Sequence, residues 1–226
     1  MTSIHPNIFW FLSSIKEHNT RDFFSFVRPL YDQIQENLLQ RTAESMSELH
    51  RQLGVDFGET KPKECMFRIY RDARRLKEWD LIYKENFAIM ISPSGKNDSR
   101  SNWFYLHIQP GGSFLAGWLY MSEPADLARV RKFLSSNGEK YYKIISNPEF
   151  VKTFGSVTWS SLTRLPKWFE QYADYLELIK MKQFLIQKSY TDQEVLSEDF
   201  MSNYIHDCKI AKPFLNFINK WCEYDW

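Results

Sequence analysis

A cluster of cationic side chains in the first half of the chain is the strongest candidate for chemistry in this sequence. Four of its members lie within residues 68–75, and the fifth follows shortly after them: Arg68, Arg71, Arg74, Arg75 and Lys84. Guanidinium groups are planar, always charged and suited to bidentate binding of a phosphate or a carboxylate. Asp72 stands among them and is placed to orient one guanidinium. The segment therefore predicts an anion-binding site, with a lattice of structural salt bridges as the competing interpretation.

A second candidate is an aromatic hairpin in the middle of the chain. Residues 103–108 and 113–120 are rich in strand-forming side chains, and the Pro-Gly pair at residues 110–111 between them is typical of a type II turn. Antiparallel pairing then gathers rings on one face: Trp103, Tyr105, His107, Phe114, Trp118 and Tyr120. Such rings can wall a ligand pocket. A second layer of core, with His107 bonded to a carbonyl, is the alternative interpretation.

These two features together define the predicted site. The charge of a small phosphate- or carboxylate-bearing ligand is expected to be bound by Arg68, Arg71, Arg74 and Lys84. The walls are expected to come from Tyr83, Trp103 and Tyr105. His107 is the candidate for proton transfer, because imidazole titrates near neutral pH, and Asp72 is its candidate catalytic partner. Whether the ligand is turned over is left open.

Several familiar chemistries lack their motifs in this sequence. The five histidines show no metal-ligand spacing, and the three cysteines form no Cys-x-x-Cys pair. The sequence contains no phosphate-binding loop, dinucleotide fingerprint or nucleophile elbow. We therefore expect no metal and no cofactor, although a catalytic triad assembled from distant segments is still open.

Composition narrows the classes of partner. The 226 residues carry 29 Lys and Arg against 28 Asp and Glu, so a net charge of +1 gives no overall basic field for nucleic acid. Apolar residues make up 43% and charged residues 25%, as in ordinary globular proteins. The start of the chain lacks a signal-peptide pattern, and no apolar run is long enough for a bilayer. A cytoplasmic protein without membrane contact is expected.

The C-terminal tail suggests a different function. Aromatic residues make up 17% of the chain, and rings recur near its end: Phe214, Phe217, Trp221, Tyr224 and Trp226. We expect this tail to dock on the core or on a second subunit. The alternative function is therefore a non-enzymatic module for protein interaction or self-association as a homo-oligomer. The loop around Trp79 is a second surface for that role.

The elements that must position these side chains follow from the hydrophobic pattern. Helical periodicity predicts helices at residues 6–16 and 21–53, with Pro29 as a kink or as the true start of the second. Strands are predicted at residues 66–70, 87–91 and 182–188 besides the hairpin, and further helices at 124–137, 139–145, 148–154, 197–208 and 212–221. The expected fold is one α+β domain over residues 1–226. An N-terminal helical pair and C-terminal helices would pack on an antiparallel-rich sheet.

Several stretches resemble a known family. They are Phe-Arg-Ile-Tyr-Arg-Asp-Ala-Arg at residues 67–74, Tyr-Lys at 83–84, the hairpin at 105–114, Leu-Pro-Lys at 165–167 and the segment 191–197. In this order they resemble the uncharacterised bacterial and fungal proteins catalogued as domain of unknown function 2461, over about residues 8–220. The resemblance implies a single domain and no established activity. Residues 74–84 are one residue longer than the family pattern, with Ile82 where Pro is usual, which implies an altered loop.

Overall fold

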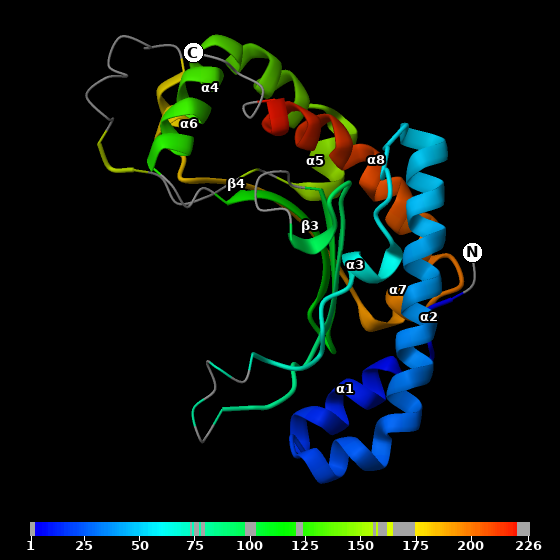
Figure 1. Cartoon of the computed structure of the whole chain (residues 1–226). Helices are drawn as coiled ribbons and strands as arrows, with labels where there is room; N and C mark the ends of the chain where they lie inside the picture. The colour runs from blue at the N-terminus through cyan, green and yellow to red at the C-terminus, as the bar shows by residue number, and fades with distance from the viewer. Residues whose placement is uncertain are drawn as a thin grey trace. The chain divides into compact units, whose positions relative to one another are not determined.

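The computed structural model describes residues 3–72, 74, 77, 80–97, 103–120, 124–155, 157, 162–164 and 175–220. Helices and a four-stranded sheet of order β1-β2-β3-β4 make it a mixed α+β protein, as predicted (Figure 1). The chain forms two compact units. Unit 1 comprises Met1–Asp98, Phe104–Leu115 and Ser189–His206, and unit 2 comprises Ser99–Trp103, Ala116–Lys188 and Asp207–Trp226. The expectation of a single domain stays a prediction.

The N-terminal helical pair forms where the periodicity predicted it. Helix α1 is Ile8–Glu17, and α2 is Arg21–Leu53. The Thr20 side chain caps α2 by accepting a hydrogen bond from the Phe23 N–H at 3.2 Å, and Gly54 ends the helix in the left-handed region at φ 62°. Since α2 runs through Pro29, this residue does not mark the helix start.

The sheet begins as three sequential strands. Strand β1 (Phe87–Ile91) pairs antiparallel with β2 (Phe104–Ile108), Phe87 opposite Ile108 and Ile91 opposite Phe104. Strand β3 is Ser113–Tyr120. The connection has the predicted turn, because the Gly112 N–H donates to the Gln109 carbonyl at 3.0 Å and Gly111 has φ 64°. A short 3₁₀ turn, η2 (Gly95–Asn97), follows β1.

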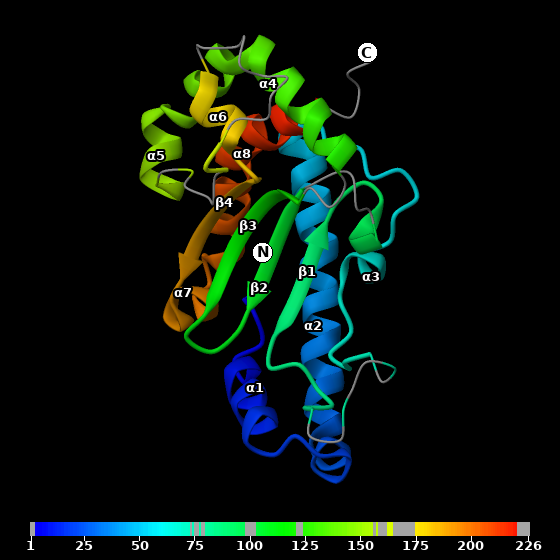
Figure 2. The ribbon, with the colours of Figure 1, turned by 90° about the vertical axis from the view of Figure 1, so that its left-hand side faces the viewer.

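The two faces of β1 and β2 differ in what covers them. One face packs on α1 and α2, with the Phe87 ring 5.9 Å from Phe11 and 6.3 Å from Tyr31. Its inward residues are all buried: Phe87, Ile89, Ile91, Phe104, Leu106 and Ile108. We call the other side the open face; it carries the half-buried Tyr105, His107 and Phe114 and the buried Ala88 and Met90. Figure 2 looks onto it, with α2 behind and none of the described helices of unit 1 in front.

The strand predicted at residues 66–70 is wrong as a continuous ladder. The helix α3 (Pro62–Cys65) precedes it, and two isolated antiparallel bridges remain, Met66 with Ile89 and Tyr70 with Tyr83. A continuous register from the first bridge would pair Tyr70 with Glu85, so the observed pairing is shifted by two residues. The extra residues between Tyr83 and Ile89 form a bulge, and this bulge interrupts the ladder.

The C-terminal half contains the remaining elements: α4 (Pro124–Ile145), α5 (Pro148–Phe154), α6 (Leu176–Lys180), β4 (Gln183–Tyr190), α7 (Asp192–Leu196) and α8 (Phe200–Asn219). Helix α4 merges two helices across a break at Asn137, with φ −129°, where the sequence predicted an end. The two predicted closing helices are instead one, because α8 continues through Pro213. Pro213 is exposed, and the burial of Phe214 and Leu215 beside it offsets its missing hydrogen bond.

The beginning of the aromatic tail is core of unit 2. Phe214 and Phe217 are buried, and their rings lie 6.2 and 5.8 Å from that of Tyr141. Residues 221–226, which carry the other three predicted rings, lie outside the described residues, as does Trp79. Docking on the core is therefore observed for the first part of the tail, and self-association stays a prediction. None of the helices in the described part is both long and apolar enough to span a bilayer.

Candidate functional site

A row of rings on the open face forms the centre of the candidate site. Strand alternation puts Tyr105 and His107 on the same side of β2 and leaves both half-buried. The His107 ring stacks on Phe114 with a centroid distance of 4.7 Å and an interplanar angle of 11°. Tyr105 lies 6.3 Å from Phe67, which meets it edge-on. We call Phe67, Tyr105, His107 and Phe114 the ring row.

Hydrogen bonds orient the His107 ring. Its Nε2 lies 2.8 Å from Gln109 Oε1, an amide oxygen that can only accept, so the ring donates from Nε2. Its Nδ1 is then the acceptor, 3.2 Å from the Tyr105 hydroxyl and 3.5 Å from Asn86 Nδ2. Burial raises the pKa of Tyr105, which keeps this hydroxyl a donor. Both ring nitrogens of His107 therefore have hydrogen-bond partners within the ring row or beside it.

Two predicted cations lie beside the ring row. The Lys84 Nζ is 5.6 Å from the centroid of the Phe67 ring, a cation–π contact. Burial and the nearby Arg71 guanidinium lower the pKa of Lys84. The Arg71 N–H donates to the Ile82 carbonyl at 2.9 Å and the Lys84 N–H to the Ile69 carbonyl at 2.8 Å. These bonds hold the two residues at the stem of the loop that runs from Arg71 to Tyr83.

The other members of the predicted charge cluster lie elsewhere. Arg74 forms an exposed ion pair with Asp72 at 2.8 Å, and both Asp72 oxygens accept hydrogen bonds from it. Asp72 therefore orients a guanidinium, one of its two expected roles. Arg75 lies outside the described residues. Arg68 lines a groove beside α2 whose lining does not include Arg71.

Two of the predicted wall residues differ in position. Tyr105 belongs to the ring row, whereas Tyr83 is 3% exposed and stacks on Phe24 at 4.3 Å with an interplanar angle of 9°. Tyr83 therefore packs in the core on the α2 side. The third predicted wall residue, Trp103, directly precedes β2, is half-buried and belongs to unit 2.

The side chain of Asn19 ties the loop stem to the helical pair. Its Oδ1 accepts from the Tyr83 N–H at 2.9 Å, and its Nδ2 donates to the carbonyls of Tyr83 and Ile15, each at 3.1 Å. One amide side chain thus binds both backbone groups of Tyr83. We call this arrangement the Asn19 clamp. It positions Lys84, the next residue along the chain.

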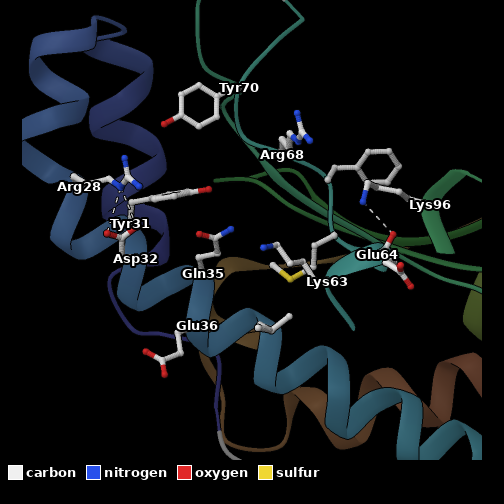
Figure 3. A pocket seen from close by; sticks show the side chains of 13 residues that line it. Arg28, Tyr31, Asp32, Gln35, Glu36, Lys63, Glu64, Arg68, Tyr70 and Lys96 are labelled. Atoms are coloured by element: carbon white, nitrogen blue, oxygen red, sulfur yellow. Dashed lines mark hydrogen bonds and ion pairs between the residues drawn. The ribbon is translucent and has the colours of Figure 1, made fainter. Parts of the chain in front are cut away.

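Arg68 lines a groove of 750 Å³ between α2 and residues 63–70, which we call the edge groove. Helix α2 contributes Tyr31, Asp32 and Gln35 to one wall, as Figure 3 shows. The other wall carries Lys63 and Arg68. The charge cluster predicted as one site is therefore split, with Arg71 and Lys84 beside the ring row and Arg68 in this groove.

Sequence reasoning missed three residues that contact the ring row or belong to it as site residues: Phe67, Asn86 and Gln109. Gln109 follows His107 by two positions, so strand alternation was a signal that could have found it. Asn86 directly precedes β1 and contacts His107. Phe67 belongs to the 66–70 segment and contacts Tyr105. Both require the strand register, which no local pattern contains. Within the described ranges, no group of three or more His, Cys, Asp or Glu could hold a metal ion.

The fold and site thus define an α+β protein with a ring-lined open sheet face. The chain belongs to the family described as "Conserved hypothetical protein (DUF2461)", which it matches over residues 7–217. This confirms the family resemblance drawn from the sequence. No curated protein and no solved structure shows a significant match to the chain.

Proposed function

We propose that the ring row, together with Arg71 and Lys84, binds a small organic anion with a phosphate or carboxylate group and a flat or apolar body. The two cations supply charge at one end of the row, and the rings supply stacking surface. Tyr105 and His107 supply one titratable pair. His107 is the group that would exchange a proton with a bound ligand, which has to displace one of the present partners of the ring, Gln109 or Tyr105.

The observation that carries this proposal is that two neighbouring cations, Arg71 and Lys84, form no ion pair with a described carboxylate. Lys84 is half-buried, and Arg71 lies close enough to disfavour its charged form. In the part of the chain that the structure describes, no carboxylate forms an ion pair with either. A bound anion would relieve the repulsion between the two cations and restore their counter-charge. Perturbed charges of this kind are typical of functional sites.

The test is a thermal-shift titration with three probes: phenyl phosphate, inorganic phosphate and phenol. At 100 times its dissociation constant, phenyl phosphate should stabilise the protein by about 2.7 kcal/mol, a rise of roughly 5–10 °C in melting temperature. Inorganic phosphate lacks the ring and should bind more weakly. Phenol lacks the charge and should give no shift.

Two variants locate the site. Arg71→Gln and Lys84→Gln should each weaken phenyl phosphate binding at least tenfold, because each removes one charged contact. Lys209→Gln is the matched control, since it removes an exposed cation on α8. A flat panel, or equal binding by Lys84→Gln and the control, would refute the proposal.

A further inference from the structure

The segment of residues 66–70 has an unused backbone edge. The Phe67 N–H donates to the Ala88 carbonyl at 2.9 Å, and the Ile69 carbonyl accepts from the Lys84 N–H at 2.8 Å. In antiparallel pairing, successive residues direct their backbone groups to opposite edges. The N–H and C=O of Arg68 and Tyr70 therefore point away from the sheet. Among the described residues, none hydrogen-bonds to these groups.

The edge groove lies beside this unused edge. Met66, Arg68 and Tyr70 share the face that looks toward α2, because Met66 is bridged to the α2-facing residue Ile89. At ordinary strand and sheet spacings, one strand residue occupies roughly 160 Å³. The groove volume of 750 Å³ therefore suits about four or five residues of an extended chain. Shape and backbone chemistry both match an added strand.

The charges of the groove indicate the chemistry of that strand. Arg28 is neutralised by Asp32 at 3.0 Å, and the Glu64 carboxylate accepts from the Lys61 N–H at 2.8 Å. Lys63 and Arg68 form no ion pair with any described carboxylate. Figure 3 shows Glu36, the remaining acid of the lining, directed away from Lys63. Glu64 keeps its negative charge, but Lys96 is a further cation, so the lining carries four cations against three carboxylates and its net charge is positive.

A second copy of this chain suits the edge poorly. Antiparallel pairing of two identical edges about residue 68 would place one Arg68 opposite the other. Like charges directly opposite in a sheet are destabilising, and charged side chains on edges protect proteins from such pairing. An acidic segment would instead bring opposite charge to Lys63 and Arg68.

We propose that the outer edge of residues 66–70 accepts an extended acidic peptide as an additional strand, with its carboxylates on Lys63 and Arg68. Backbone hydrogen bonds to Arg68 and Tyr70 supply affinity, and the groove side chains supply preference for acidic sequence. This site lies on the α2 side of the segment. Phe67 is shared with the ring row, but Lys63 and Arg68, which would bind the carboxylates, are not.

The experiment uses the full chain and fluorescence anisotropy with a labelled, end-blocked peptide, Glu-Val-Glu-Val-Glu-Val. A second peptide has the same sequence with alternate amides N-methylated, which preserves its charge but removes donors needed by an added strand. The double variant Lys63→Gln/Arg68→Gln tests the cations, and Lys209→Gln is the control for loss of charge. Arg71→Gln separates this site from the ring row.

Saturable binding of the unmodified peptide is expected, with at least a tenfold weaker affinity for the N-methylated peptide and for the double variant. Arg71→Gln and Lys209→Gln should bind within twofold of the parent chain. Equal binding of both peptides would refute the proposal that the peptide binds as an added strand. Complete competition by inorganic phosphate would show that the groove binds small anions instead of a peptide. Absence of binding, or a dimer of this chain lost in Tyr70→Pro, would also overturn the proposal.

Discussion

Neighbouring residues of β1 and β2 lie on opposite faces of the sheet and differ in their expected roles. Leu106 and its cross-strand partner Ile89 are buried against the helical pair, whereas on the open face His107 is half-buried and its partner Ala88 is buried. The first face consists of aliphatic and Phe side chains, and the second carries a hydrogen-bonded imidazole among rings. Stability and candidate chemistry are therefore assigned to alternate residues of the same strands, so each can be changed with limited effect on the other.

The largest expected effect is the loss of stability on removing a side chain from the buried face. Leu106→Ala should lower the free energy of unfolding by about 2–5 kcal/mol, because the cavity would lie between the sheet and the helical pair. Urea unfolding measures this loss. His107→Ala, the neighbouring position, is the control and should cost less, since its ring is half-exposed. Equal losses at the two positions would show that the open face is also structural core.

A smaller loss of stability is expected from removing a hydrogen bond on the open face. Tyr105→Phe removes the hydroxyl that donates to His107 Nδ1 and should cost about 0.5–1.5 kcal/mol of unfolding free energy. The double variant with His107→Phe should cost less than the sum of the two single changes, because both remove the same hydrogen bond. Strictly additive losses in chemical denaturation would contradict the bond as drawn.

The smallest effect concerns charge at the end of the ring row. Burial and Arg71 lower the pKa of Lys84 below its ordinary value of 10.5, so the folded chain binds fewer protons than the unfolded chain just below that pH. Stability should therefore rise with pH in this alkaline range, in proportion to the difference in bound protons.

Lys84→Met should remove this alkaline rise. Unfolding experiments on parent and variant between pH 8 and 10 measure the difference, and Lys209→Gln should keep the parent slope. The range stops where tyrosine titration begins, because burial also raises the pKa of Tyr105 and would lower stability at higher pH. A variant with the full parent slope would assign the rise to other groups.

Much of the fold was predictable because the decisive signals are local. The period of α2, the Thr20 cap and the Pro-Gly turn each act within a few residues, and the observed bounds of α2, β1 and β3 equal the predicted ones. The errors occur where distant contacts decide. Two closing helices are predicted at residues 197–208 and 212–221, but α8 is one helix that runs through Pro213 beside the buried Phe214 and Leu215.

The sequence predicts which site residues share a face of one strand, but not which residues of different segments come into contact. Strand alternation correctly placed Tyr105 and His107 on one face. The sequence predicts the Arg cluster as one site, but residues three apart in an extended segment face opposite ways, and only Arg68 of the pair lines the groove beside α2. Alternation was the signal available for that split. The contacts of Phe67 and Asn86 with the row depend on register and on a two-residue bulge, which the sequence pattern does not encode.

The Asn19 clamp has a consequence for how this loop can diverge. A side-chain amide presents the same donor and acceptor as a peptide group, so Asn19 acts as a one-residue substitute for a neighbouring strand. It anchors Tyr83 from the helical pair, independently of how many residues connect Arg71 to it. Insertions and substitutions between these anchors can accumulate while Lys84 keeps its position. The loop is free to vary in length, and the cation that follows it is not displaced.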